Sequence, residues 1–513
     1  MVTSELSEIE LELDKGSWKR AEEFILQLDE PDTCLVGWLK SELAYQKKDF
    51  KEAKQGCLSV LEQINENHPD LHLFQAKCKI TLGKIARAIG DLNAAQTFYT
   101  EALDLLRAGD PSSELALVNY LLGNLFLVLK NFKKAEKHYR EYLALSTSLK
   151  LDPWYVARAH YGLGNFYYYQ GLFDDAKQEF QQGLSFFQEE ETDLLLADLC
   201  INLGSIYYQR SSLDSASKRI NQAIRIYNAL NDHLAEIVAI QKLVQVFIEM
   251  VEKSKALELM NDTYYRFKNK SILSVDFILF RALILLEDGQ VDEAREQLES
   301  LLKITNLSLE QESQILDHLI KLYYFEEKYV EALELAKKLQ GLYKGFEDVY
   351  DYAVAASHAG LALIQLDRSQ EGIKEIEHSI KVFTKIKDHN AIAHLLYSAV
   401  IAFLSRSQYI EALNLIKREL NHRKKHVDLD ATQELQLLID IVVLSKISED
   451  TGTFDDFFQQ YKKKRSQLIK KIGIADALPK IGRLSRESTL RNELRAQMHE
   501  IEEEIQKMIK IGV

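Results

Sequence analysis

Tyrosine and asparagine side chains recur at matching places in the middle of the chain. Tyr120 is followed four residues later by Asn124, and Tyr161 is followed four residues later by Asn165. An asparagine amide both donates and accepts hydrogen bonds, so it can pair with a peptide bond of any sequence, and tyrosine adds apolar area with a polar tip. This chemistry indicates recognition of a polypeptide.

Motifs that carry catalytic or metal chemistry are missing from the sequence. It holds no His-Glu-x-x-His, no Gly-x-Ser-x-Gly and no Gly-Lys-Ser/Thr phosphate loop. His422 and His426 are four residues apart, but the cationic residues 423–425 between them would repel a metal ion. The cysteines form no pair at ligand spacing, so we expect buried thiols. We expect a protein that is not an enzyme, with no cofactor and no metal.

The tyrosines and asparagines belong to a phrase that occurs three times. Its copies read Asn119-Tyr-Leu-Leu-Gly-Asn-Leu-Phe, His160-Tyr-Gly-Leu-Gly-Asn-Phe-Tyr and Cys200-Ile-Asn-Leu-Gly-Ser-Ile-Tyr. Twelve residues after the glycine of each Leu-Gly pair comes an alanine in a second amphipathic segment, at Ala135, Ala176 and Ala216. Small residues at both places predict two helices that cross at close range.

The small residue of the second segment recurs along most of the chain. It is found at Ala21, Ala53, Ala95, Ala135, Ala176, Ala216, Ala256, Ala294, Ala332, Gly372 and Ala412. After a shorter first step, the spacing stays near 40 residues, which indicates a repeat. The first 50 residues are included, as a helix pair around Ala21.

This pattern resembles the tetratricopeptide repeat (TPR), with its Leu-Gly pair in the first helix and its alanine in the second. Similar stretched repeats occur in LGN-type adaptors, kinesin light chains and peptide receptors of the Rap and PlcR type. The resemblance covers residues 1–420, and its best repeats lie in 76–235. It implies an all-α fold, a right-handed α-solenoid of about eleven TPR-like helix pairs with a C-terminal helical cap.

The resemblance also implies a concave groove lined by the first helix of each pair. If each glycine faces the second helix, the groove residues follow from helical spacing. The predicted peptide-binding residues are Tyr120, Asn124, Arg158, Tyr161, Asn165, Tyr168, Asn202, Ser205, Tyr208, Gln241 and Gln245, with Tyr169, Gln209, Asp317, Lys321 and Tyr324 on the same face. The alternative for the asparagines is hydrogen bonding within the repeat array.

The regular repeat is lost after residue 420. Residues 421–472 are expected to form a degenerate helical repeat, residues 473–489 a basic linker, and residues 490–513 an amphipathic helix. That helix either caps the array or forms a coiled-coil homodimer. The basic tract Lys462–Arg486 is either a solvated linker or a contact to RNA, to a membrane or to the protein's own groove.

Composition limits the partner and the compartment. The formal charge of −14 disfavours DNA and is compatible with a basic partner. The first residues have no apolar signal region, and the apolar run Leu435–Leu444 is too short to span a bilayer, so we expect a cytoplasmic protein.

These features predict a scaffold or adaptor that binds a peptide segment of a partner protein. Two alternatives remain, a peptide-sensing regulator that switches effector binding and a TPR subunit of a larger assembly. A softer joint is expected near residues 250–275, where the sequence is polar and poorly periodic.

Overall fold

The computed structural model describes residues 9–16, 19, 22–23, 33–64, 70–188, 191–346, 349–427, 429–472, 479 and 482–511. The chain divides into two compact units, residues 1–273 and 274–513. The boundary falls at the end of the segment in which a joint was expected. Ala21 and residues 473–478, 480 and 481 of the expected linker lie outside the described residues.

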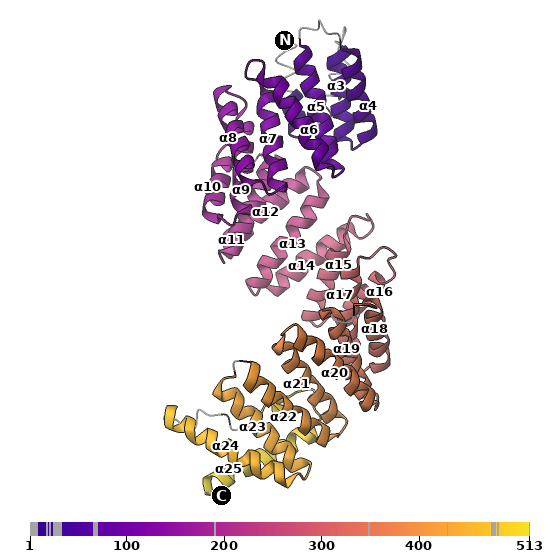
Figure 1. The fold of residues 1–513 in the computed structure, drawn as a ribbon, viewed down its shortest axis with the longest axis vertical. Helices are drawn as coiled ribbons and strands as arrows, with labels where there is room; N and C mark the ends of the chain where they lie inside the picture. The colour runs from indigo at the N-terminus through magenta and orange to yellow at the C-terminus, as the bar shows by residue number, and fades with distance from the viewer. Residues whose placement is uncertain are drawn as a thin grey trace. The chain divides into compact units, whose positions relative to one another are not determined.

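Unit 1 stacks its helices as consecutive pairs (Figure 1). The pairs are α3 (Thr33–Gln46) with α4 (Phe50–Gln63), α5 (Leu71–Ala88) with α6 (Leu92–Arg107), α7 (Ser113–Val128) with α8 (Phe132–Ser148), α9 (Pro153–Tyr169) with α10 (Phe173–Leu184), α11 (Leu194–Gln209) with α12 (Leu213–Ala229), and α13 (His233–Glu249) with α14 (Lys253–Phe267).

Unit 2 continues the pattern and ends in a cap. Its pairs are α15 (Val275–Glu287) with α16 (Val291–Leu301), α17 (Leu309–Phe325) with α18 (Tyr329–Leu342), α19 (Tyr350–Gln365) with α20 (Ser369–Lys385), α21 (His389–Ser405) with α22 (Tyr409–His426), and α23 (Ala431–Ile447) with α24 (Thr451–Ile472). The short helix η2 (Leu484–Arg486) and α25 (Asn492–Ile511) follow. The predicted α-solenoid of TPR-like helix pairs is confirmed. Among the described residues the pairs begin at α3, and the expected degenerate repeat supplies the last of them.

The turns inside the pairs follow from local backbone preferences. Lys130 ends the turn after α7 with a φ of 56°, and Gly171 does the same after α9 with a φ of 76°. Asn131 then caps α8, because its side chain accepts a hydrogen bond from the backbone N–H of Lys134. Left-handed residues and N-caps of this kind reverse the chain within a few residues.

The repeated glycine sets the distance between the two helices of a pair. A Cβ atom on Gly164 would lie 2.4 Å from the ring of Phe180, and one on Gly123 would lie 2.7 Å from the ring of Tyr139. Ala135 and Ala176 are fully buried at the same crossings. The expected close crossing is therefore present, and an aromatic ring occupies the space that the missing Cβ leaves.

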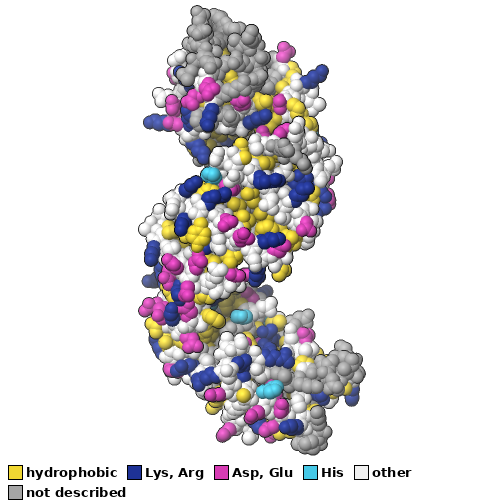
Figure 2. Space-filling view, turned by 180° about the vertical axis from the view of Figure 1, so that it is seen from behind, with side chains coloured by type: hydrophobic (Ala, Val, Ile, Leu, Met, Phe, Trp, Pro, Cys, Tyr) yellow, Lys and Arg dark blue, Asp and Glu magenta, His cyan; other side chains and the backbone are white. Residues whose placement is uncertain are grey.

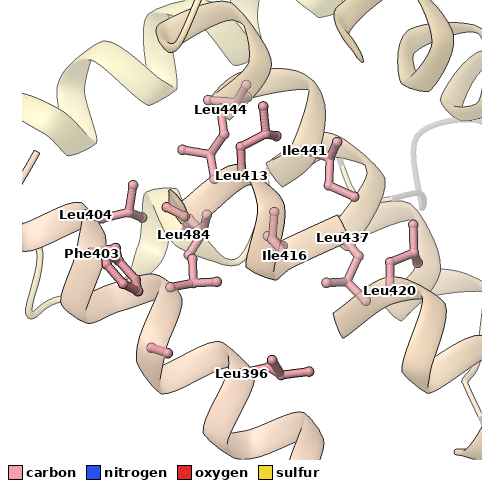
Figure 3. Close-up of a cluster of buried hydrophobic side chains, with 14 of the residues drawn as sticks. Leu396, Phe403, Leu404, Leu413, Ile416, Leu420, Leu437, Ile441, Leu444 and Leu484 are labelled. Carbon is pink, nitrogen blue, oxygen red and sulfur yellow. The ribbon is translucent and has the colours of Figure 1, made fainter. Parts of the chain in front are cut away.

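The C-terminal part of unit 2 packs more tightly than the sequence predicted. Leu484 lies among apolar side chains of α22 and α23 (Figure 3), and the carboxylate of the fully buried Glu419 accepts hydrogen bonds from the guanidinium of Arg483 at 3.0 and 3.1 Å. Residues 482–489, expected as part of a basic linker, are thus attached to the core. A buried carboxylate needs a paired cation, which explains the attachment.

Helix α25 covers the open face of α23. Leu494, Met498 and Ile505 are buried in the same apolar cluster as α23. The cap expected for this helix is present, and these side chains face the inside of unit 2. No helix in the described part of the chain combines the length and apolar composition needed to cross a bilayer.

Candidate peptide-binding groove

The first helices of successive pairs form one continuous face of unit 1. Contacts join α7 to α9, α9 to α11 and α11 to α13. The eleven predicted peptide-binding residues lie on these four helices: Tyr120 and Asn124 on α7, Arg158, Tyr161, Asn165 and Tyr168 on α9, Asn202, Ser205 and Tyr208 on α11, and Gln241 and Gln245 on α13.

Part of the predicted set converges on one pocket. The pocket has a volume of about 190 Å³ and is lined by Tyr168, Ser205, Tyr208, Gln209, Ile220, Lys242, Gln245 and Val246. Its lining joins α9, α11, α12 and α13, and it mixes apolar with polar side chains. Mixed linings of this kind suit a polypeptide, since apolar side chains supply contact area and polar side chains fix orientation.

The polar groups of the pocket combine donors and acceptors. Gln209 donates from Nε2 to the hydroxyl of Tyr168 at 3.0 Å, and the hydroxyl of Tyr208 donates to Glu249 at 3.4 Å. Lys242 lies at the limit of hydrogen-bond distance from Ser205, at 3.5 Å. Burial raises the pKa of the Tyr208 hydroxyl, which keeps it protonated as a donor near neutral pH.

The two asparagines are already engaged through their carbonyl oxygens. Asn124 accepts a hydrogen bond from the hydroxyl of Tyr139 on α8 at 2.7 Å, and Asn165 accepts one from Asn202 on α11 at 2.9 Å. Both contacts stabilise the repeat array. A contact of these asparagines with a peptide stays a prediction, and each residue also has this structural role.

Arg158 is buried in an aromatic cage. Its guanidinium lies 4.6 Å from the ring centre of Tyr120 and 4.5 Å from that of Trp154, and its Nε donates to the hydroxyl of Tyr142 at 2.8 Å. Planar guanidinium groups favour such stacking when they are desolvated.

Residues 9–16 lie on the same face, next to Arg158. The carboxylate of Asp14 is 3.7 Å from Nη2 of Arg158, and the carboxylate of Glu10 is 2.7 Å from Nζ of Lys77 on α5. These residues were expected to begin a helix pair stacked before α3, from which they would not reach α9. Their apolar side chains explain the difference, because the groove offers Ile9 and Leu13 nearly complete burial.

The sequence reasoning missed Lys77 although the signal was available. Lys77 precedes Gly83 by six residues, as Arg158 precedes Gly164. The helical register that selected Arg158 therefore also places Lys77 on the groove face. Tyr169 is exposed on α9, and Gln241 is half-buried on α13 outside the pocket.

The remaining predicted positions lie in unit 2 and do not join this site. Nε2 of His358 lies 2.9 Å from the carboxylate of Asp317, which also pairs with Lys321 at 2.6 Å, and Gln365 donates to Tyr324 at 3.2 Å. These groups are engaged with each other inside the array.

Within the ranges that the structure covers, no group of three or more His, Cys, Asp or Glu side chains is arranged to hold a metal ion. Cys34, Cys57, Cys78 and Cys200 are all buried, as expected.

Charges of both signs alternate over the surface. Figure 2 shows Lys and Arg interspersed with Asp and Glu on the face in view. In the basic tract, Lys464 pairs with Glu434, and Arg483 with Glu419. These two cations are paired with carboxylates within unit 2.

Comparison with known proteins agrees with the repeat architecture. Residues 100–380 match the MalT-like TPR region family, and residues 76–105 match the tetratricopeptide repeat. The chain belongs to the family of MalT-like TPR proteins.

Individual relatives are distant. The chain is 22% identical over 236 residues to Protein KINESIN LIGHT CHAIN-RELATED 2 of Arabidopsis thaliana, a match of 45% of this chain and 36% of that protein. It thus spans about a third of that relative's length.

Among solved structures, the apo form of RapI has a TM-score of 0.53 at 14% identity, covering 68% of this chain and 98% of RapI. BtubC from P. vanneervenii has a TM-score of 0.34 at 22% identity, covering 44% of this chain and 92% of BtubC. The RapI likeness shows a shared fold.

Proposed function

We propose that this protein is a non-enzymatic scaffold that binds a peptide segment of a partner protein on the first-helix face of unit 1. The supporting observation is the convergence of Tyr168, Ser205, Tyr208 and Gln245 on one pocket. These residues come from three repeats, so sequence change within a single repeat would not be enough to bring them together. Family membership supports the same class of function, since TPR arrays present such faces to partners.

The binding chemistry follows from the pocket's lining. Ile220 and Val246 accept an apolar side chain, while Gln209 and Gln245 are placed for hydrogen bonds to the main chain of an extended or helical segment. In TPR arrays, contacts spread along a continuous face give affinity through area and specificity through spacing.

The experiment compares two Ser→Trp variants of the full chain. Ser205→Trp fills the pocket, whereas Ser215→Trp places the same side chain at an exposed position on α12 of the same helix pair. Proteins captured from the native cell by the tagged chain are quantified by mass spectrometry, after circular dichroism shows that both variants are folded. A direct partner should be retained by Ser215→Trp and lost by Ser205→Trp. Equal capture by the two variants would contradict the proposed site.

A further inference from the structure

Residues 9–16, here called segment 9–16, lie as a short helix across the first helices of unit 1. Ile9 and Leu13, one helical turn apart, are 1% and 3% exposed and pack in a cluster with Trp38 of α3. Leu11 packs on the other side, against the cluster that contains Tyr155 of α9. The segment therefore occupies the groove face as a bound peptide would.

One carboxylate of the segment binds a buried lysine. Lys77 is 5% exposed, and its Nζ lies 2.7 Å from carboxylate oxygens of both Glu10 and Glu114. The same Nζ lies 4.2 Å from the ring centre of Trp38. Because Glu114 belongs to α7, the groove neutralises Lys77 even without the segment, and Glu10 adds a second pairing.

The second carboxylate, that of Asp14, faces Arg158, a cation to which the groove itself offers no carboxylate among the described residues. Among the described residues, Asp14 supplies the one ion pair of Arg158, at 3.7 Å, and it also accepts a hydrogen bond from Tyr155 at 3.2 Å. Within the same residues, Nη2 of Arg158 is buried without a hydrogen-bond partner. Lys84 of α5, by contrast, has its own carboxylate in the groove, Glu42, at 2.8 Å.

The fit of the segment is incomplete. Asp14 stops short of hydrogen-bond distance to Arg158, and Nε1 of Trp38 is a second buried donor with no partner in the described part of the chain. A partly open space of about 40 Å³ remains between the segment and the groove, lined by Glu10, Leu13, Trp38, Lys77 and Tyr155 among others. Unpaired buried donors cost free energy, so a ligand that reached them would bind more tightly than the segment does.

We propose that this part of the face, between α3 and α9, binds an acidic amphipathic helix of a partner, with two carboxylates one helical turn apart, and that segment 9–16 is its resident competitor. The proposal rests on the proposed function, because it assumes that the same face takes peptides, and it adds the chemistry of the ligand. Lys77 and Arg158 bind the two carboxylates of the partner helix. The surfaces that hold Ile9 and Leu13 bind its apolar residues. A glutamate at the place of Asp14 is one methylene longer and reaches Nη2 of Arg158.

The experiment measures binding of a fluorescein-labelled synthetic peptide with the sequence of residues 5–16 by anisotropy. The full chain is compared with the variant Glu10→Lys/Asp14→Lys, whose segment is repelled by Lys77 and Arg158. A tethered segment competes at an effective concentration of order millimolar, so the peptide should bind the variant at least about tenfold more tightly than the wild-type chain. The peptide with Asp14→Glu should bind the variant more tightly still.

A matched pair of variants locates the site. The Glu10→Lys/Asp14→Lys variant is called the opened chain. In it, Lys77→Glu should weaken binding of the peptide at least about tenfold. Lys79→Glu makes the same change at a lysine of α5 that pairs with Glu101, and it should leave the binding unchanged. Equal peptide affinity for the wild-type and opened chains, or no binding to the opened chain, would overturn the proposal.

A second measurement uses the unmodified chain, in case the opened variant does not fold. Hydrogen exchange of residues 9–16 should accelerate when an excess of unlabelled peptide displaces the segment, and unchanged exchange would overturn the proposal. Failure here, with partner capture still lost in Ser205→Trp, removes this inference and leaves the proposed function standing. The reverse result removes the pocket around Ser205 as the partner's site and leaves the acidic-helix site between α3 and α9.

Discussion

Asp440 shows how one buried side chain attaches the C-terminal segment to unit 2. The residue is 2% exposed, and its carboxylate accepts hydrogen bonds from the backbone N–H groups of Leu484 at 3.0 Å and Arg483 at 3.2 Å. Burial raises the pKa of Asp440 from 3.8 to about 7, against the opposing effect of Arg483. The protonated form is therefore favoured in the folded state relative to the unfolded chain.

This shift predicts a pH-dependent stability of unit 2. Because the folded-state pKa is raised, its contribution is complete below pH 3.8 and is lost as the pH rises through about 7. Asp440→Asn cannot ionise, so relative to wild type it should gain on the order of 2 kcal/mol in unfolding free energy between pH 5 and pH 8. Urea denaturation at the two pH values measures this difference.

Asp450→Asn is the control for the pH experiment. Hydrogen bonds from Thr453 lower the pKa of Asp450, so this carboxylate stays ionised across the range from pH 5 to pH 8. The difference in unfolding free energy between Asp450→Asn and wild type should therefore not change with pH. An Asp440→Asn difference that is also constant would show that Asp440 does not titrate in this range.

Individual residues also show which features of the groove could be predicted from the sequence. Helical register placed Tyr168, Ser205, Tyr208 and Gln245 on one face, and the structure brings them to one pocket. Helical register gives the direction in which a side chain leaves the helix axis. It does not identify the atom with which that side chain forms a hydrogen bond. The hydrogen bond from Tyr139 to Asn124 joins two helices, so it depends on how their rotamers meet.

At the scale of the helix pair, the distance at which the first and second helix cross is set by a glycine, which has no side chain. Gly164 on α9 allows the ring of Phe180 to pack against the backbone, and Gly204 does the same for Ile220. Where the glycine is present, the facing residue fills the gap, so the two positions are coupled in each repeat. Interiors packed to this density tolerate little added volume.

Gly164→Ala should therefore destabilise unit 1. The new Cβ would lie 2.4 Å from the ring of Phe180, which is fully buried and has no room to move. Overpacking of this kind costs about 1–3 kcal/mol, measurable as a lower urea midpoint.

Gly341→Ala provides the comparison, because a Cβ there meets no atom within 4 Å near the end of α18. Removing a helical glycine should leave stability unchanged or raise it by up to about 1 kcal/mol. Equal effects of the two substitutions would show that the α9–α10 crossing is not limited by contact.

At the scale of the whole molecule, the repeat array is divided into two compact units at residues 273 and 274. In a repeat array each pair contacts chiefly its neighbours, so stability is a sum of local terms. Apolar clusters are accordingly separate, with Tyr139 in one cluster of unit 1 and Phe403 in the large cluster of unit 2.

This division predicts that damage stays local. Phe267→Ala in unit 1 and Phe403→Ala in unit 2 each remove a ring that is at most 1% exposed, at a cost of about 3–5 kcal/mol. Hydrogen exchange measured by mass spectrometry should show reduced protection in the unit that carries the substitution, with the other unit unchanged. Loss of protection in both units by both variants would show a single cooperative block.

The sequence alone determined the repeat and its phase. A small residue about every 40 positions and a Leu-Gly pair ahead of it fix which helix faces which, because helical periodicity converts spacing into direction. The fold class, the pairs from α3 to α22, the C-terminal cap and the groove face all follow from this local information.

Only the tertiary structure decided where segments outside the repeat attach. Segment 9–16 has an apolar stripe suited to a helix pair, and it lies instead across α3 to α9, where Lys77 and Arg158 meet its carboxylates. Residues 482–489 carry basic side chains typical of a linker, and buried carboxylates on α22 and α23 hold them. Both placements depend on charges that are distant in the sequence and become neighbours only after the array has folded, so no local pattern encodes them.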